Sequence, residues 1–110
     1  MTNRKKSLQD LIEFRKPPAE MRAILAEFEW DCDQELVQLE RRHVIFVLKR
    51  FVAGEILSEK VEAWTNLIEC RDDVDYEEVK EVLHILANPL ITYELTPSVA
   101  VSMIEKLMDA

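Results

Sequence analysis

Carboxylate side chains dominate the chemistry that this sequence offers. Ten Asp and Glu residues lie between Glu55 and Glu81, against only Lys60, Arg71 and Lys80 in the same tract. Carboxylates in such numbers can bind metal cations or attract a basic protein surface. The residues around them decide which of these chemistries the chain favours.

Metal binding is the less favoured of the two. Asp31, Asp33 and Glu35 place carboxylates at alternate positions, as a calcium loop does, but Leu36 stands where such a loop requires glycine. Helix capping explains these residues better, and no loop organises the acids between Glu55 and Glu81. We expect no metal site and no other cofactor.

The remaining reactive residues do not indicate catalysis. His43 and His84 lie on different predicted helices without a neighbouring motif, and we interpret them as ordinary surface or boundary residues. Cys32 and Cys70 lie outside any zinc or nucleophile signature, and we interpret them as buried free thiols. The sequence therefore predicts a protein that is not an enzyme.

Charge is distributed unevenly along the chain. Residues 1–54 carry 10 Lys and Arg against 9 Asp and Glu, a net charge of +1, whereas residues 55–110 carry 4 against 13, a net charge of −9, and the two sum to −8. Such an acidic pole repels nucleic acids and membrane surfaces and attracts cationic proteins. We therefore expect a protein partner, with neither nucleic acid nor membrane bound.

Helices joined by short connections are the elements that must position these side chains. Gly54 is the only glycine, and apolar residues recur at spacings of three and four. The predicted helices begin near Ser7, Pro18, Asp31 or Asp33, Ser58, Asp75 and Thr96 or Pro97, and the connection from Leu90 to Leu95 is interpreted as extended. The third helix, ending at Gly54, would span about 20 residues and is apolar on two sides, which is typical of a central helix.

The predicted fold is all-α: a compact bundle of five to six helices around a long central helix at residues 36–52. A single helical domain is expected at residues 7–110, after a flexible basic tail at residues 1–6. The 110 residues, 48% of them apolar, suffice for one core. No apolar run reaches the length of a signal peptide or a membrane-spanning helix, so we expect a cytoplasmic protein.

The acidic tract on the fourth and fifth helices has two interpretations. It is either a solvated helix face or a surface that requires its like charges in order to bind a basic protein. Trp64 lies on the apolar side of the fourth helix and is expected in the core, whereas Trp30, at the junction of two helices, can be core or contact. The predicted partner-binding residues are Glu59, Glu62, Glu69, Asp72, Asp73, Asp75 and Trp30.

Three stretches of the chain carry a resemblance to known proteins. They are Trp30-Asp31 with Glu35-Leu36-Val37; Phe51 to Ile56 with Trp64, Glu69 and Arg71 to Glu77; and Leu86-Ala-Asn-Pro89 with Leu95-Thr-Pro97. Over residues 28–107 the chain resembles small bacterial proteins similar to immunity proteins of contact-dependent growth inhibition and colicin-like systems. The resemblance implies a helical fold and non-enzymatic blockage of a toxin domain, often a basic nuclease, with no catalytic residues.

The leading hypothesis is thus an immunity protein whose acidic helical face covers the cationic active site of a toxin. The alternative is a structural or regulatory helical module that has no toxin. Such a module would act through another protein partner or through self-association along a second apolar stripe that includes Leu39 and Phe46.

Overall fold

Helices make up almost all of the regular structure. The computed structural model describes residues 4–27 and 36–109. In this part of the chain the elements are α1 (Arg4–Ile12), α2 (Pro18–Leu25), β1 (Val37–Gln38), α3 (Arg41–Val52), α4 (Ser58–Glu69), β2 (Val74–Asp75), the 3-10 turn η1 (Glu77–Val79), α5 (Lys80–Ala87) and α6 (Pro97–Asp109). The all-α bundle predicted from the sequence is confirmed, and the connection from Leu90 to Leu95 contains no strand.

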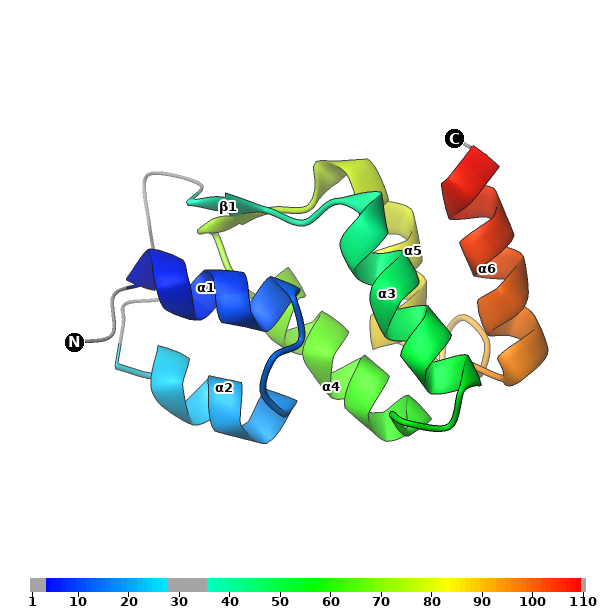
Figure 1. Ribbon diagram of the computed structural model, residues 1–110, viewed down its shortest axis with the longest axis horizontal. Helices are drawn as coiled ribbons and strands as arrows, with labels where there is room; N and C mark the ends of the chain where they lie inside the picture. Colours follow the sequence, from blue (N-terminus) through cyan, green and yellow to red (C-terminus); the bar gives the residue numbers. More distant parts are fainter. Residues whose placement is uncertain (1–3, 28–35, 110) are drawn as a thin grey trace.

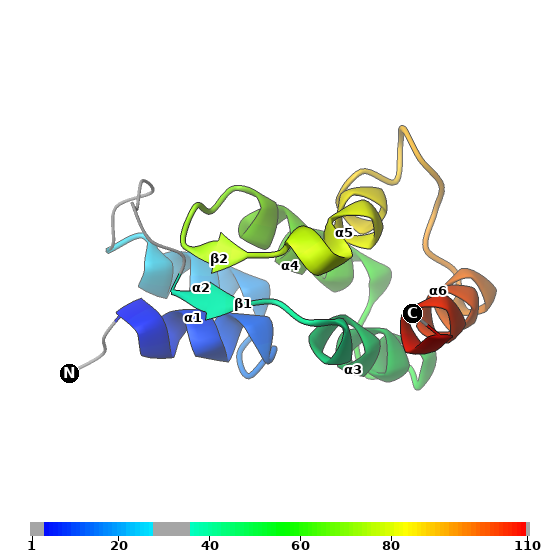
Figure 2. The same cartoon turned by 90° about the horizontal axis from the view of Figure 1, so that it is seen from above.

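The helices are arranged so that α4 lies between the two ends of the molecule. Helices α1 and α2 lie side by side at one end, and α3, α5 and α6 occupy the other (Figure 1). Seen from above, α1, α3 and α6 follow one side of the molecule, while α4 and α5 follow the other (Figure 2). Helix α6 packs against α3, and α5 packs against α4.

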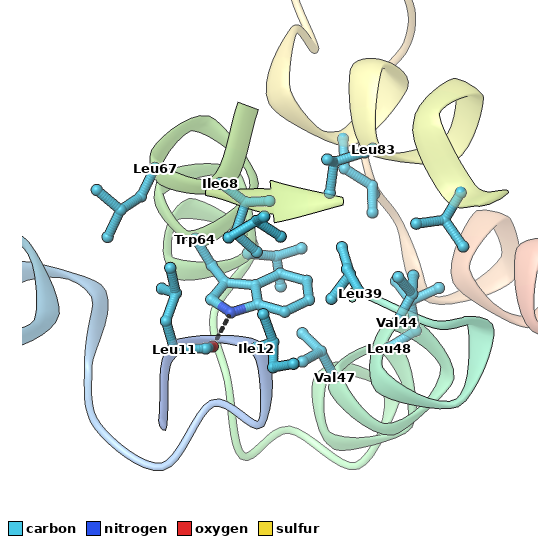
Figure 3. Packing of buried hydrophobic residues seen from close by; sticks show 14 of the residues in the cluster. Leu11, Ile12, Leu39, Val44, Val47, Leu48, Trp64, Leu67, Ile68 and Leu83 are labelled. Carbon is cyan, nitrogen blue, oxygen red and sulfur yellow. Dashed lines mark hydrogen bonds between the residues drawn. The ribbon is translucent and has the colours of Figure 1, made fainter. Parts of the chain in front are cut away.

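Trp64 occupies the centre of the core, as the sequence predicts. Its side chain is 1% exposed, and its Nε1 donates a hydrogen bond of 2.7 Å to the carbonyl oxygen of Leu11 (Figure 3). This bond joins α4 to the end of α1 across 53 residues of sequence. The buried residues around the indole come from α1, α3, α4 and the residue that follows β1, and they include Ile12, Leu39, Val47 and Ile68.

Helix α1 ends in a turn that also depends on Trp64. Phe14 has a φ of 51°, a left-handed conformation that costs a residue other than glycine about 1–2 kcal/mol. The centroid of the Phe14 ring lies 5.9 Å from that of the Trp64 ring. The guanidinium of Arg50 lies 5.5 Å from the Phe14 centroid. These contacts from α4 and α3 offset the backbone strain.

The start of α1 differs from the prediction. The helix begins at Arg4, so Arg4, Lys5 and Lys6 form its first turn instead of belonging to a flexible tail, and Ser7 is buried inside the helix instead of capping it. Arg4 Nε donates to Oδ2 of Asp73 at 2.8 Å, which holds this turn against the rest of the domain.

The third helix begins later than predicted. Residues 28–35 lie outside the described part of the chain, and residues 36–40 are extended and include β1. The helix starts at Arg41 because the backbone N–H of Glu40 donates to Nδ1 of His43 at 2.9 Å, a side-chain contact of the capping-box type. Its end agrees with the prediction, since Gly54 adopts a φ of 82° directly after the C-cap Ala53.

The extended residues before α3 form a short parallel pair that the sequence did not reveal. Val37 lies opposite Val74 and Gln38 opposite Asp75. The N–H of Leu36 donates to the carbonyl of Asp73, and the N–H of Leu39 donates to that of Asp75, both at 2.8 Å. Runs of two residues show no periodicity, so only the folded chain identifies them.

The remaining helices begin within a few residues of the positions predicted from the sequence. Ser58 is the first residue of α4 and not its cap. Asp75 accepts the N–H of Glu77 at 3.1 Å, but a 3-10 turn follows and α5 begins only at Lys80. Thr96 accepts the N–H of Val99 at 3.3 Å and so caps α6 as predicted.

Replacing Trp64 with Phe removes the donor to Leu11 and leaves a gap in the core. We expect the free energy of unfolding in urea to fall by about 2–4 kcal/mol. The matched control is Tyr93→Phe, which removes a polar atom from a half-exposed ring and should change stability by less than about 0.5 kcal/mol. Equal stability of the two variants would contradict the central role of Trp64.

Candidate protein-binding surface

The predicted partner-binding acids do not form one continuous face. Glu59 and Glu62 lie on the N-terminal half of α4, whereas Asp72 and Asp75 follow its C-terminal end. Ten residues of α-helix separate Glu59 from Glu69, a distance of about 15 Å. Trp30 lies outside the described residues, so its predicted role as a contact stays a prediction.

Asp73 is excluded from any exposed face, which corrects the prediction. Its side chain is fully buried, and Arg71 donates to both of its oxygens at 2.9 Å while Arg4 adds a third bond. Burial alone raises the pKa of the Asp73 carboxyl, but the hydrogen bonds from Arg71 and Arg4 outweigh it and lower the pKa. Asp73 is a structural ion-pair residue, since a buried carboxylate requires such partners.

Glu69 faces α5. Its Oε2 lies 3.6 Å from Nδ1 of His84, and its backbone carbonyl accepts a hydrogen bond from the Tyr76 hydroxyl. Burial, together with the charges of Glu69 and Asp72, raises the pKa of Tyr76. Glu69 and Asp72 therefore contribute to a negative local potential, but Glu69 is only 25% exposed and is partly engaged within the chain.

Glu59 and Glu62 line a hollow between α4 and the connection from α5 to α6. Its volume is about 340 Å³, and its lining combines acidic and apolar side chains. The residues are Ser58, Glu59, Glu62, Ile85, Leu86, Pro89, Leu90, Tyr93, Glu94 and Leu95. We call this hollow the acidic groove.

The carboxylates of the acidic groove lack cationic partners within the described part of the chain: no Lys, Arg or His there forms an ion pair with Glu59, Glu62 or Glu94. Glu59 has a structural reason for its position, because an acid in the first turn of a helix is stabilised by the helix dipole. Glu62 and Glu94 lie outside any first turn. Beside them Leu90 is 100% exposed and Tyr93 49%.

The second acidic region is a wide hollow of about 510 Å³ around β2 and η1. Asp72 and Asp75 line it, but so do the cations Arg71 and Lys80, and Lys80 pairs with Glu77 at 3.1 Å. Its charge is therefore partly neutralised by the chain itself. The acidic groove is the better candidate for contact with a partner because its carboxylates form no ion pair within the described chain and lie beside apolar surface.

The exposure of His43 and Cys70 differs from the prediction, whereas that of His84 agrees with it. His84 is exposed, but His43 is buried, and burial followed by the charge of Arg42 lowers the pKa of His43. Because Nδ1 of His43 accepts the N–H of Glu40, the proton of the neutral ring lies on Nε2. Cys70 is exposed and not buried, since it lies just beyond the end of α4.

The second apolar stripe proposed for self-association is not a continuous surface. Leu39 is fully buried in the core. Phe46 is half exposed, and the guanidinium of Arg50 lies 5.6 Å from its ring centroid. The extended backbone before α3 turns Leu39 inward, away from the helical position that the prediction gave it, so this stripe does not support the alternative hypothesis.

The described residues include neither a metal-binding cluster nor a membrane-spanning helix. Within residues 4–27 and 36–109 no group of three or more His, Cys, Asp and Glu side chains is placed to hold a metal ion. Among the helices of the described chain none is long and apolar enough to cross a bilayer. Comparison of the sequence and the structure with family models, curated proteins and solved structures finds no match.

The Asp73 ion pairs predict a specific acid sensitivity. A lowered folded-state pKa stabilises the protein above the ordinary value of 3.8, and this contribution is lost as pH falls through the folded pKa. Asp73→Asn should lower the free energy of unfolding in urea by about 3 kcal/mol at pH 7. In this variant the free energy of unfolding should also depend less steeply on pH below about pH 4.

The exposed neighbour variant Asp72→Asn is the control for this measurement, because it changes the same charge without breaking a buried pair. A steep acid loss that persists in Asp73→Asn would show that other carboxyls control it.

Proposed function

We propose that the chain is a non-catalytic binding protein that docks a basic protein on the acidic groove. The observation that carries the proposal is the set of carboxylates of Glu59, Glu62 and Glu94, which have no ion-pair partner in the described chain and line the same groove as the exposed Leu90 and Tyr93. Like charges held close together cost stability unless a cationic partner neutralises them.

Charge and apolar area would serve different parts of the binding reaction. The negative potential around the groove attracts a basic surface and raises the association rate in a salt-dependent manner. Leu90, Tyr93 and the apolar groove residues supply surface that becomes buried in the complex, which slows dissociation. The hollow is at the small end of the range of binding pockets, so it would form the centre of a larger interface.

The finer proposal is that binding inhibits the partner, as an immunity protein inhibits its toxin. A toxin nuclease carries a positive active site for nucleic acid, and an acidic helical surface would occupy it by presenting similar charge. The resemblance stated above supports this step, and the unpaired carboxylates of the groove suit it. No catalytic residue is required of this chain.

Reversing charge in the groove should abolish this attraction. The tagged protein and its Glu59→Lys/Glu62→Lys variant are incubated with lysate at low salt, and proteins eluted by a salt gradient are identified by mass spectrometry. We expect the parent to retain a stoichiometric basic protein and the variant to retain less of it, by about tenfold or more.

The matched control reverses two exposed acids away from the groove, Glu20 on α2 and Glu105 on α6. Equal loss of binding in this control would show that net charge alone matters. Binding that is insensitive to salt and to both groove substitutions would contradict the proposal.

A further inference from the structure

Leu90 and Ile91 expose apolar surface in the connection from α5 to α6. Leu90 is 100% exposed and Ile91 75%, and the connection that carries them extends beyond α5 (Figure 2). Single exposed apolar residues are ordinary on protein surfaces, but two adjacent ones in a connection that projects from the domain present a compact apolar contact. Leu90 also lines the acidic groove, so this contact and the groove are continuous.

The turn that carries Leu90 and Ile91 is fixed by side-chain hydrogen bonds and not by burial of its apolar residues. The hydroxyl of Thr92 lies 3.0 Å from the carbonyl of Ile85 and 2.7 Å from that of Asn88. The backbone N–H groups of Ile91 and Thr92 both donate to the Asn88 carbonyl, at 3.2 and 3.0 Å. The chain therefore holds Leu90 and Ile91 outward in a defined conformation.

Asn88 anchors the base of the same turn. Its side-chain amide donates to the carbonyl of His84 at 2.8 Å, and Asn66 on α4 donates to the carbonyl of Ala87 at 3.2 Å. The turn is thereby attached to both helices that support the groove. A contact segment that is ordered before binding loses less conformational entropy when its partner arrives.

We propose that the turn Asn88–Thr92 is a preorganised apolar anchor that inserts into an apolar recess bordered by Lys or Arg on the basic partner. The charge complementarity comes from Glu59, Glu62 and Glu94, which line the same groove as Leu90. This inference rests on the proposed function and adds the shape of the partner's site: a hollow, apolar centre with a cationic border.

The first test examines the free protein. Backbone ¹⁵N relaxation should give residues 88–92 order parameters near those of rigid backbone, about 0.85, and Thr92→Val, which replaces the hydroxyl with a methyl group of similar size, should lower them. Order parameters below about 0.6 in the parent protein would overturn preorganisation.

The second test uses a probe that reproduces the proposed recess: a β-cyclodextrin with primary amines on its rim, which offers an apolar cavity bordered by positive charge. Titration into ¹⁵N-labelled protein should shift the amide signals of Leu90, Ile91 and the groove residues. Leu90→Ser/Ile91→Ser should weaken binding of the probe by about tenfold or more. The matched control is Met108→Ser, since Met108 is 63% exposed on α6, and it should leave the affinity unchanged.

The outcomes separate the anchor from the function on which it rests. Binding that Glu62→Lys weakens but Leu90→Ser/Ile91→Ser does not would overturn the anchor and leave the charged surface intact. Equal affinity for the amine-bearing and the neutral cyclodextrin would count against the role of charge in both proposals. Shifts centred on Met108 or Leu57 would place apolar contact elsewhere and overturn the anchor.

Discussion

The buried carboxylate of Asp73 is the interaction on which the arrangement of the helices depends. A charge without solvent contact must be neutralised, and here Arg71 and Arg4 do so from two directions. Arg71 fixes the turn that follows α4, and Arg4 brings the first turn of α1 to the same point. The carbonyl of Asp73 in turn accepts the N–H of Leu36, so the segment before α3 is held there as well.

Trp64 extends this connection into the core. Its indole N–H binds the last turn of α1, so the two ends of α1 are tied to the domain by different means, an ion pair at Arg4 and a hydrogen bond at Leu11. With α1 and α4 fixed, α5 packs on α4, and the connection from α5 to α6 closes the acidic groove. The groove is therefore supported by helices and not by a loop alone.

The contrast between Asp73 and the groove carboxylates supports a binding function. Asp73 serves the fold, and the chain supplies it with two arginines. Glu62 and Glu94 serve no ion pair in the described chain, yet they lie beside Leu90, whose apolar side chain is fully exposed. A charge-steered protein interface combines unpaired charge with apolar surface that is held in place. Here Thr92 and Asn88 hold the apolar residues beside the unpaired carboxylates.

Local patterns in the sequence predicted the helices, but they did not predict the contacts between residues that are distant in the sequence. Gly54, Thr96 and the core position of Trp64 followed from helix-end and periodicity rules that act within a few residues. The burial of Asp73 could not be predicted in this way, because its partner Arg4 lies 69 positions away. In the sequence Asp73 is one of many acids in an acidic tract.

The same limit applies to the site. The sequence indicated Glu59 and Glu62 by their charge, but Glu94 and the apolar groove residues come from a different segment and were missed. Leu90 and Tyr93 lay in a connection without periodicity, so no pattern suggested that α5 would direct them toward α4. The signal available in the sequence was the apolar dipeptide Leu90-Ile91 between Asn88-Pro89 and Thr92.

Carboxyl footprinting is the most direct test of the proposed surface: the chain is labelled free and bound to the basic protein proposed as its partner, and modified Asp and Glu residues are located by mass spectrometry. The account predicts that Asp73 is unmodified in both states, and that Glu59, Glu62 and Glu94 are modified in the free protein and protected in the complex. Full modification of these three in the complex, with protection at Glu20 or Glu105 instead, would contradict it.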